Sequence, residues 1–306
     1  MRIRLALLAF ALSGAMAVIS SAGFEAGAQT PKVAIPKAIS ADPPGDAKFP
    51  ARMDVLHIPS GGVTINGVAY VAAGKGPHPV FVLFHGLPGN EKNLDLAQAV
   101  RRAGWTVVTI NYRGSWGSPG DFRFAQNLED ARNTLAFIRD PATAAKLGVD
   151  HKRIAIGGHS MGGWVTAETA AVEPAILGAV TISAGDMGAL GVLGKTTRAP
   201  IVATMRDNME TLAGVTPDSM TDEVIAHGPE WSFATLAPRL KATRLLVLYS
   251  NDFVKGTSVD LIAKVKAAGS TTIESAYVPT DHSWSDSRIQ LEARVINWLQ
   301  SLPAGH

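Results

Sequence analysis

Apolar runs alternate with amphipathic segments over most of the chain. Residues 80–84 are apolar throughout, which is typical of a strand buried on both faces of a sheet. Segments with apolar residues three and four positions apart follow such runs and indicate covering helices. This alternation predicts βαβ units around a mostly parallel sheet. Strands are expected at 53–59, 63–72, 80–84, 105–112, 153–157, 177–183, 244–249 and 272–278, and helices at 90–103, 127–138, 163–171, 259–268 and 288–302.

One long stretch interrupts the alternation. About sixty residues separate the strand that ends near Ser183 from the one that begins at Arg244, which is far beyond an ordinary connection. The stretch has helical patches and is rich in methionine: it contains Met187, Met205, Met209 and Met220. We therefore expect a helical cap inserted at about 187–240. Its apolar side chains either face a substrate or only pack the cap onto the sheet.

The N-terminus has the layout of a secretory signal peptide over residues 1–28. Arg2 and Arg4 precede a largely apolar run at 5–20, and Ala26, Gly27 and Ala28 form a small-residue cleavage pattern. The alternative is an uncleaved membrane anchor, for which the run is of borderline length. The pattern predicts export to the periplasm or the medium, with no stable membrane insertion after cleavage.

Residues 29–50 carry five prolines and few large apolar groups, so an extended proline-rich tether is expected there. Residues 51–306 show one continuous pattern without an internal repeat, which predicts a single domain. Within its first part, Asn66 and Gly67 suggest a turn or bulge.

Composition excludes several functions. The formal charge is only +2, so there is no basic surplus for binding nucleic acid. The chain has no cysteine, which removes disulfides, thiolate catalysis and cysteine-bound metals. Paired metal-ligand histidines and a phosphate-binding loop are also missing from the sequence. We expect no metal and no cofactor.

The strongest chemical signal is the run Gly157-Gly158-His159-Ser160-Met161-Gly162-Gly163. It places G-x-S-x-G between an expected strand and an expected helix. A nucleophile at such a turn needs strained backbone, so small residues must stand at 158 and 162. The helix that follows directs its free N–H groups at the reacting centre. The motif predicts that Ser160 is a nucleophile and that His159 is a packing residue.

A serine nucleophile needs a histidine base and a carboxylate that orients it. His282 follows the last expected strand and precedes the final helix, and Asp252 follows the strand before that. Both therefore stand at carboxyl ends of strands, in the chain order serine, acid, histidine. Asp186 follows the strand next to the nucleophile and remains an alternative acid, although we favour Asp252.

The oxyanion hole is expected from the loop after residues 80–84 and from the amide that follows the nucleophile. In that loop Gly86 permits a tight turn, and Pro88 has no N–H to donate. The N–H groups of Leu87 and Met161 are the expected donors.

These motifs resemble those of the α/β-hydrolase superfamily, over about residues 63–302. The loop at 111–115, the elbow at 158–162 and the order of Asp252 and His282 are similar to prolyl-oligopeptidase-like and dienelactone-hydrolase-like enzymes. The resemblance implies an α/β fold with an eight-stranded, mostly parallel sheet and hydrolysis through an acyl-enzyme. Two features differ from these families: the segment before residue 63 is too short for a propeller, and serine stands where dienelactone hydrolases have cysteine.

The substrate expected from these features is a small neutral carboxylic ester, because no cluster of basic residues marks a carboxylate or phosphate site. A short peptide or amide requires the same triad and remains an alternative. A further alternative is a non-catalytic binding module with this fold. The sequence leaves the oligomeric state open.

Overall fold

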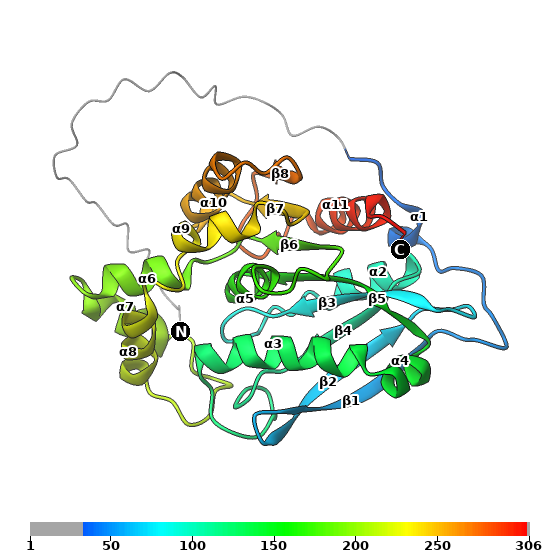
Figure 1. Cartoon of the computed structure of the whole chain (residues 1–306), viewed down its shortest axis with the longest axis horizontal. Helices are drawn as coiled ribbons and strands as arrows, with labels where there is room; N and C mark the ends of the chain where they lie inside the picture. The colour runs from blue at the N-terminus through cyan, green and yellow to red at the C-terminus, as the bar shows by residue number, and fades with distance from the viewer. Residues whose placement is uncertain (1–32, 305–306) are drawn as a thin grey trace, which may run out of the picture. The chain divides into compact units, whose positions relative to one another are not determined.

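The computed structural model describes residues 33–304, and the signal peptide expected over residues 1–28 lies outside them. Eight strands form one sheet in the order β1-β2-β4-β3-β5-β6-β7-β8 (Figure 1). The first two pairings, β1 with β2 and β2 with β4, are antiparallel, and all others are parallel. This confirms the predicted α/β fold. The strands are β1 (Arg52–Ser60), β2 (Val63–Val71), β3 (His78–Phe84), β4 (Thr106–Ile110), β5 (Val149–His159), β6 (Gly178–Ile182), β7 (Leu245–Tyr249) and β8 (Ile273–Tyr277).

Helices cover both faces of the sheet and create two hydrophobic cores. The central strand β3 divides its side chains between them: Val80, Val82 and Phe84 lie in one core, and Phe81 and Leu83 in the other. This division explains why residues 80–84 are apolar without alternation. One core is covered by α3 (Phe124–Arg139), α4 (Pro141–Leu147), α5 (Met161–Ala170) and α10 (Lys255–Ala267), and the other by α2 (Leu94–Arg102) and α11 (Arg288–Ser301).

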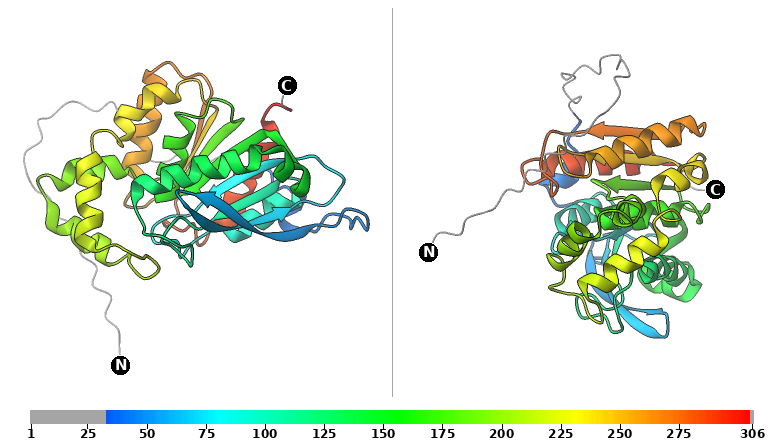
Figure 2. Two further views of the ribbon diagram at one scale, coloured as in Figure 1. Left: turned by 60° about the horizontal axis from the view of Figure 1, so that its bottom comes forward. Right: turned by 90° about the vertical axis from the view of Figure 1, so that its left-hand side faces the viewer.

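The segment expected as a cap is helical. Figures 1 and 2 show α6 (Met187–Gly194), α7 (Arg198–Arg206) and α8 (Pro217–His227) grouped at one end of the sheet. Glycines on α6 permit its close approach to α8, because a Cβ on Gly191 would lie 1.7 Å from the carbonyl oxygen of Val224. The segment ends with α9 (Phe233–Leu236) and the short η1 helix (Ala237–Leu240), which pack against α10.

The segment expected as an extended tether over residues 29–50 is described from residue 33 onward. It contains the one-turn helix α1 (Lys37–Ser40), which contacts α2 and α11. Arg102 donates hydrogen bonds to the carbonyl oxygens of Ala38 and Ile39, which supplies the anchoring that the proline content alone did not suggest.

Asn66 and Gly67 form no turn or bulge, since β2 pairs with β1 in unbroken register through both residues. A Cβ on Gly67 would lie 2.8 Å from the carbonyl oxygen of Thr109, so glycine is needed there for contact with the neighbouring strand β4. Among residues 33–304, no helix has both the length and the apolar character needed to cross a membrane.

Candidate active site

Ser160 stands at a sharp turn between β5 and α5. Its φ and ψ angles are 57° and −121°, a conformation that residues with a side chain rarely adopt. The two flanking glycines are required sterically. A Cβ on Gly158 would lie 2.1 Å from the carbonyl oxygen of Gly162, and one on Gly162 would lie 2.2 Å from that of Phe84. The turn thus holds Ser160 out of the sheet at the first turn of α5.

The loop after β3 lies directly beside this serine. A Cβ on Gly86 would lie 3.0 Å from Cβ of Ser160 and 3.6 Å from its Oγ. The Nδ1 atom of the buried His85 is 2.7 Å from the carbonyl oxygen of Gly86, and because a carbonyl only accepts, Nδ1 carries the proton. The same peptide unit contains the N–H of Leu87, which points opposite to that carbonyl. His85 therefore orients the Leu87 N–H.

The N–H of Met161, the other expected donor, lies at the first position of α5. Helix geometry leaves the N–H groups of a first turn without an intrahelical acceptor. The backbone of both expected donors thus flanks Ser160, one from the β3 loop and one from α5.

His282 and Asp252 are in direct contact. Nδ1 of His282 lies 2.8 Å from Oδ2 of Asp252, whose side chain is only 2 % exposed. The two residues come from the ends of adjacent strands, β7 and β8, as the chain order suggested. His282 and Ser160 line one common cavity. The structure thus places the three residues expected to act together around one site.

Two further contacts hold the Asp252 carboxylate. Ser250 donates to Oδ2 at 2.8 Å and the N–H of Val254 donates to Oδ1 at 3.0 Å. Burial alone would raise the pKa of Asp252, but hydrogen bonds from His282 and Ser250 outweigh it and hold the pKa at about 2. The carboxylate is therefore charged at neutral pH and fixes the proton of His282 on Nδ1, which leaves Nε2 as the basic atom.

The alternative acid, Asp186, binds backbone N–H groups of the cap. Its Oδ1 accepts the N–H of Ala189 at 2.8 Å and its Oδ2 accepts that of Phe233 at 2.9 Å. Asp186 thus caps the N-terminus of α6 and ties it to α9. Both oxygens are engaged with backbone N–H groups inside the cap.

Sequence reasoning missed the residues that support the pair. The hydroxyl of Ser183 lies 2.9 Å from that of Ser250, and the indole of Trp284 donates to Ser183 at 3.1 Å. These three buried residues form a chain behind Asp252. Ser183 directly follows β6 and Ser250 directly follows β7. A polar residue at the carboxyl end of a strand was the signal in the sequence that could have identified them.

His159 does more than pack, which corrects the expectation from the motif. Its Nε2 lies 2.8 Å from the carbonyl oxygen of His282, and the two rings are 4.6 Å apart. Burial, reinforced by the proximity of His282, lowers the pKa of His159 to about 4, so the ring is neutral at neutral pH. A neutral His159 donates through Nε2 and holds the backbone of His282.

Two cavities meet at Ser160. The larger has a volume of about 430 Å³ and is lined mainly by apolar residues of the cap and of the loop after β7, among them Leu190, Met205 and Phe253. The smaller, of about 200 Å³, lies along the β3 loop and contains His282. Met187 and Met205 line the larger cavity, whereas Trp231 packs on Trp164 at 5.1 Å. The cap therefore both faces the site and packs on the body.

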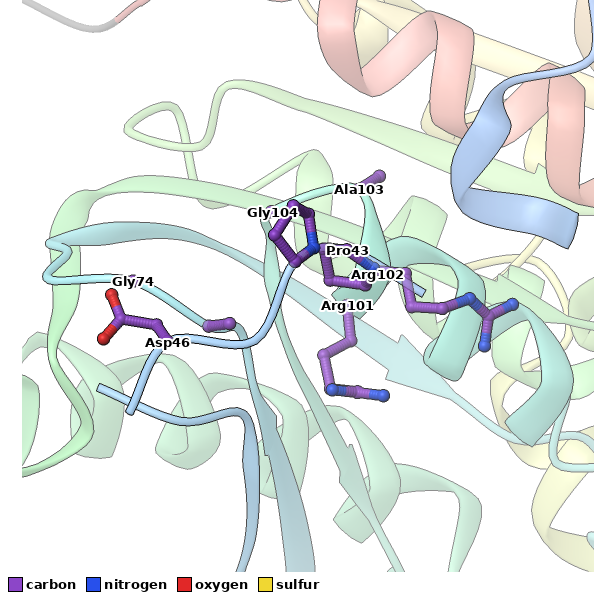
Figure 3. A pocket seen from close by; sticks show the side chains of 9 residues that line it. Pro43, Asp46, Gly74, Arg101, Arg102, Ala103 and Gly104 are labelled. Atoms are coloured by element: carbon purple, nitrogen blue, oxygen red, sulfur yellow. The ribbon is translucent and has the colours of Figure 1, made fainter. Parts of the chain in front are cut away.

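A separate cavity of about 270 Å³ lies between residues 43–46 and the end of α2 (Figure 3). Figure 3 shows Arg102 extending away from it toward α1, where its guanidinium is engaged. Asp46 is also satisfied, by the N–H groups of Lys48 and Phe49. This cavity shares no lining residue with those at Ser160. Within residues 33–304, no three His, Asp or Glu side chains converge as metal ligands would.

A family model described as the alpha/beta hydrolase family matches residues 81–298. This region contains Ser160, Asp252, His282 and the β3 loop. No match was found among curated protein sequences.

Solved structures share the fold at low identity. An esterase from Pyrobaculum calidifontis is 19% identical with a TM-score of 0.61, covering 83% of this chain and 87% of that one. Brefeldin A esterase, described as a bacterial homologue of human hormone sensitive lipase, is 16% identical with a TM-score of 0.61, covering 86% and 81%. An acylaminoacyl peptidase from Pyrococcus horikoshii is 17% identical with a TM-score of 0.62; the match covers 84% of this chain but only 42% of that one.

Proposed function

The chain belongs to the alpha/beta hydrolase family, and we propose that it is a serine hydrolase that cleaves carboxylic esters through an acyl-enzyme. The contact of 2.8 Å between Asp252 and His282, which lines one cavity together with Ser160, carries this proposal. The apolar cavity on the other side of the serine favours an ester with an apolar acyl group. The esterases that share the fold are consistent with this choice.

In the first half-reaction, Oγ of Ser160 attacks the ester carbonyl while Nε2 of His282 takes the hydroxyl proton. The N–H groups of Leu87 and Met161 stabilise the oxyanion that forms. When the C–O bond to the alcohol breaks, His282 returns the proton to the leaving oxygen. Asp252 keeps the imidazole in the productive tautomer and stabilises its charged form.

In the second half-reaction, water takes the place of the alcohol. His282 removes a proton from the water, the new C–O bond forms, and the bond to Oγ of Ser160 breaks with return of that proton. The products are the free acid and the regenerated serine, so neither step requires a cofactor.

A fluorophosphonate probe, which reacts with activated serines, tests the proposal. The purified protein is labelled and the modified peptide is identified by mass spectrometry. We expect labelling at Ser160, hydrolysis of p-nitrophenyl butyrate, and loss of both in Ser160→Ala. Folded protein that neither labels nor hydrolyses the ester would favour a non-catalytic binding module.

We also propose that the protein is exported. The charged head, apolar run and small-residue pattern of residues 1–28 support this. Mass spectrometry of the protein recovered from the periplasm or medium is expected to find Gln29 at its N-terminus. Recovery of a full-length chain in the membrane fraction would contradict cleavage.

A further inference from the structure

The two cavities at Ser160 define two ends of a substrate. Leu87, Ser160 and Asn208 line both of them, so they mark the junction where the ester carbonyl must lie. One substituent of the ester then enters the larger cavity and the other the smaller. The shape of the site by itself leaves open which substituent takes which.

The position of the histidine decides the orientation. His282 lines the smaller cavity, and among the described residues it is not part of the lining of the larger one. A general acid must reach the leaving oxygen to protonate it. The alcohol therefore occupies the smaller cavity and the acyl group the larger.

The walls of the two cavities differ in chemistry. Leu190, Leu193 and Met205 of the cap line the larger cavity together with Phe253 and Val254, and this apolar wall suits a hydrocarbon chain. The smaller cavity has about half that volume, and Asn90, Glu91, Asn208 and Ser283 contribute polar groups to its wall. An alcohol that binds there is small and gains hydrogen bonds rather than apolar contact.

Charge further restricts the alcohol. Glu91 is the acidic residue in the wall of the smaller cavity, and among the described residues no lysine or arginine lines it. The two cations close by lie outside the lining and have partners of their own. Lys92 donates to Asn111 at 2.9 Å. Arg288 pairs with Asp95 at 2.7 Å and donates to the carbonyl oxygen of Ser283 at 2.9 Å, behind the cavity wall. His159, which also lines the cavity, is neutral at neutral pH because burial lowers its pKa to about 4.

We propose that this site takes esters of an apolar acid with a small polar alcohol that is neutral or cationic, and discriminates against an anionic alcohol through Glu91. The inference rests on the proposed ester hydrolysis and adds the orientation and the substrate class. It assigns Leu190 to acyl selection and Glu91 to selection of the alcohol.

The test uses hexanoate esters of three small alcohols: ethylene glycol, choline and glycolate. We expect kcat/KM to be higher for the choline and glycol esters than for the glycolate ester. Glu91→Gln removes the charge but keeps an oxygen that can accept the N–H of Asn93, as Glu91 does at 2.6 Å. In this variant the ratio of kcat/KM for the choline ester to kcat/KM for the glycolate ester is expected to fall about tenfold. A tenfold change corresponds to about 1.4 kcal/mol of lost charge discrimination. Comparing ratios between wild type and variant cancels the intrinsic reactivity of each ester.

Glu210→Gln is the matched control, because it removes the same charge from an exposed cap residue outside both cavities. Its ratio is expected to equal that of the wild type. Leu190→Trp tests the other end: kcat/KM for glycol hexanoate should fall relative to glycol acetate, while the choline-to-glycolate ratio stays unchanged.

The outcomes separate the inference from the proposed function. Absence of both hydrolysis and fluorophosphonate labelling overturns the proposed function. Labelling at Ser160 without hydrolysis of these esters, or a ratio in Glu91→Gln within twofold of wild type, overturns the inference alone. A change in the choline-to-glycolate ratio in Leu190→Trp would overturn the orientation of the substrate.

Discussion

The indole N–H of Trp116 donates a hydrogen bond of 2.8 Å to the carbonyl oxygen of Pro88. Thr211 of the cap donates its hydroxyl to the same oxygen at 3.2 Å, and its own carbonyl accepts the N–H of Trp116 at 3.2 Å. Pro88 directly follows Leu87, the proposed oxyanion donor. Residues from the cap and from the loop after β4 therefore both bind the loop after β3, which carries the proposed oxyanion donor Leu87 and is called the oxyanion loop below.

Removal of this indole donor should slow catalysis more than it weakens binding. In Trp116→Phe we expect kcat to fall about tenfold, less than the loss of a direct oxyanion donor, with KM changed by less than about threefold. Steady-state kinetics measure both constants. Thr211→Val removes the second donor, and the double variant should deviate from additivity because both groups bind one oxygen.

Trp164→Phe is the control for Trp116→Phe. It also loses an indole-to-carbonyl hydrogen bond, of 3.1 Å, but the acceptor is Trp231 of the cap rather than a residue of the loop after β3. Its thermal midpoint should fall while kcat remains within about threefold of wild type. An unchanged kcat in Trp116→Phe would show that Trp116 does not position the loop.

The role of Trp116 could not be predicted from the sequence. Its indole bonds a carbonyl oxygen 28 residues away, and the residue lines neither cavity at Ser160. No local pattern encodes such a contact, because it depends on how three loops converge in the fold.

The sheet and the elbow were predictable because their signals are local. Buried strands are continuous apolar runs, and the turn at Ser160 needs glycine at 158 and 162 for steric reasons visible in the motif itself. The positions of Asp252 and His282 followed from the rule that parallel strands end at one edge of the sheet. The anchoring of residues 33–50 and the support from His159 required tertiary contacts.

The two candidate acids should respond differently to the same substitution. Asp252→Asn leaves a neutral group against His282, so kcat is expected to fall by about 10⁴. Asp186→Asn keeps an oxygen for one of the two backbone N–H groups and sets an amide nitrogen against the other. It should cost about 1 kcal/mol of unfolding free energy while lowering kcat less than about tenfold. Kinetics and urea unfolding of both variants separate these effects. A larger loss of kcat in Asp186→Asn would reassign the acid.

Glu168 on α5 is a buried acid that the proposed mechanism does not use. Burial raises its pKa to about 7, and its Oε1 has no hydrogen-bond partner among the described residues. A folded-state pKa above the ordinary value of 4.5 means that the folded chain binds the proton more tightly than the unfolded chain. The contribution of this proton to the unfolding free energy is fully present below pH 4.5 and is lost as the pH rises through 7.

Glu168→Gln keeps the shape of the protonated side chain at every pH. At pH 8 the variant should be more stable than wild type by about 3 kcal/mol, and at pH 4 the two should be nearly equal. Urea unfolding at both pH values measures the difference. Glu173→Gln, which loses an ion pair of 2.7 Å with Arg139, is the control and should bring no gain at pH 8. Equal stability of Glu168→Gln and wild type at pH 8 would contradict the raised pKa.

The backbone strain at Ser160 predicts an unusual order of stability. The residue has a φ of 57° and a ψ of −121°, where glycine pays little and any Cβ is unfavourable. Ser160→Ala keeps the Cβ and the strain, whereas Ser160→Gly releases it. Strain of this kind costs about 1–3 kcal/mol, against about 0.5–1 kcal/mol for the extra chain entropy of glycine.

We therefore expect Ser160→Gly to exceed Ser160→Ala in unfolding free energy by about 1 kcal/mol, although both lack the nucleophile and should lose at least about 10³-fold in kcat. Urea unfolding compares the two on equal terms, because neither has activity to preserve. If Ser160→Ala were the more stable, the turn would not be strained in solution. If Ser160→Gly has a higher unfolding free energy than wild type and Ser160→Ala does not, the native protein sacrifices that stability to place a nucleophile between the oxyanion loop and His282.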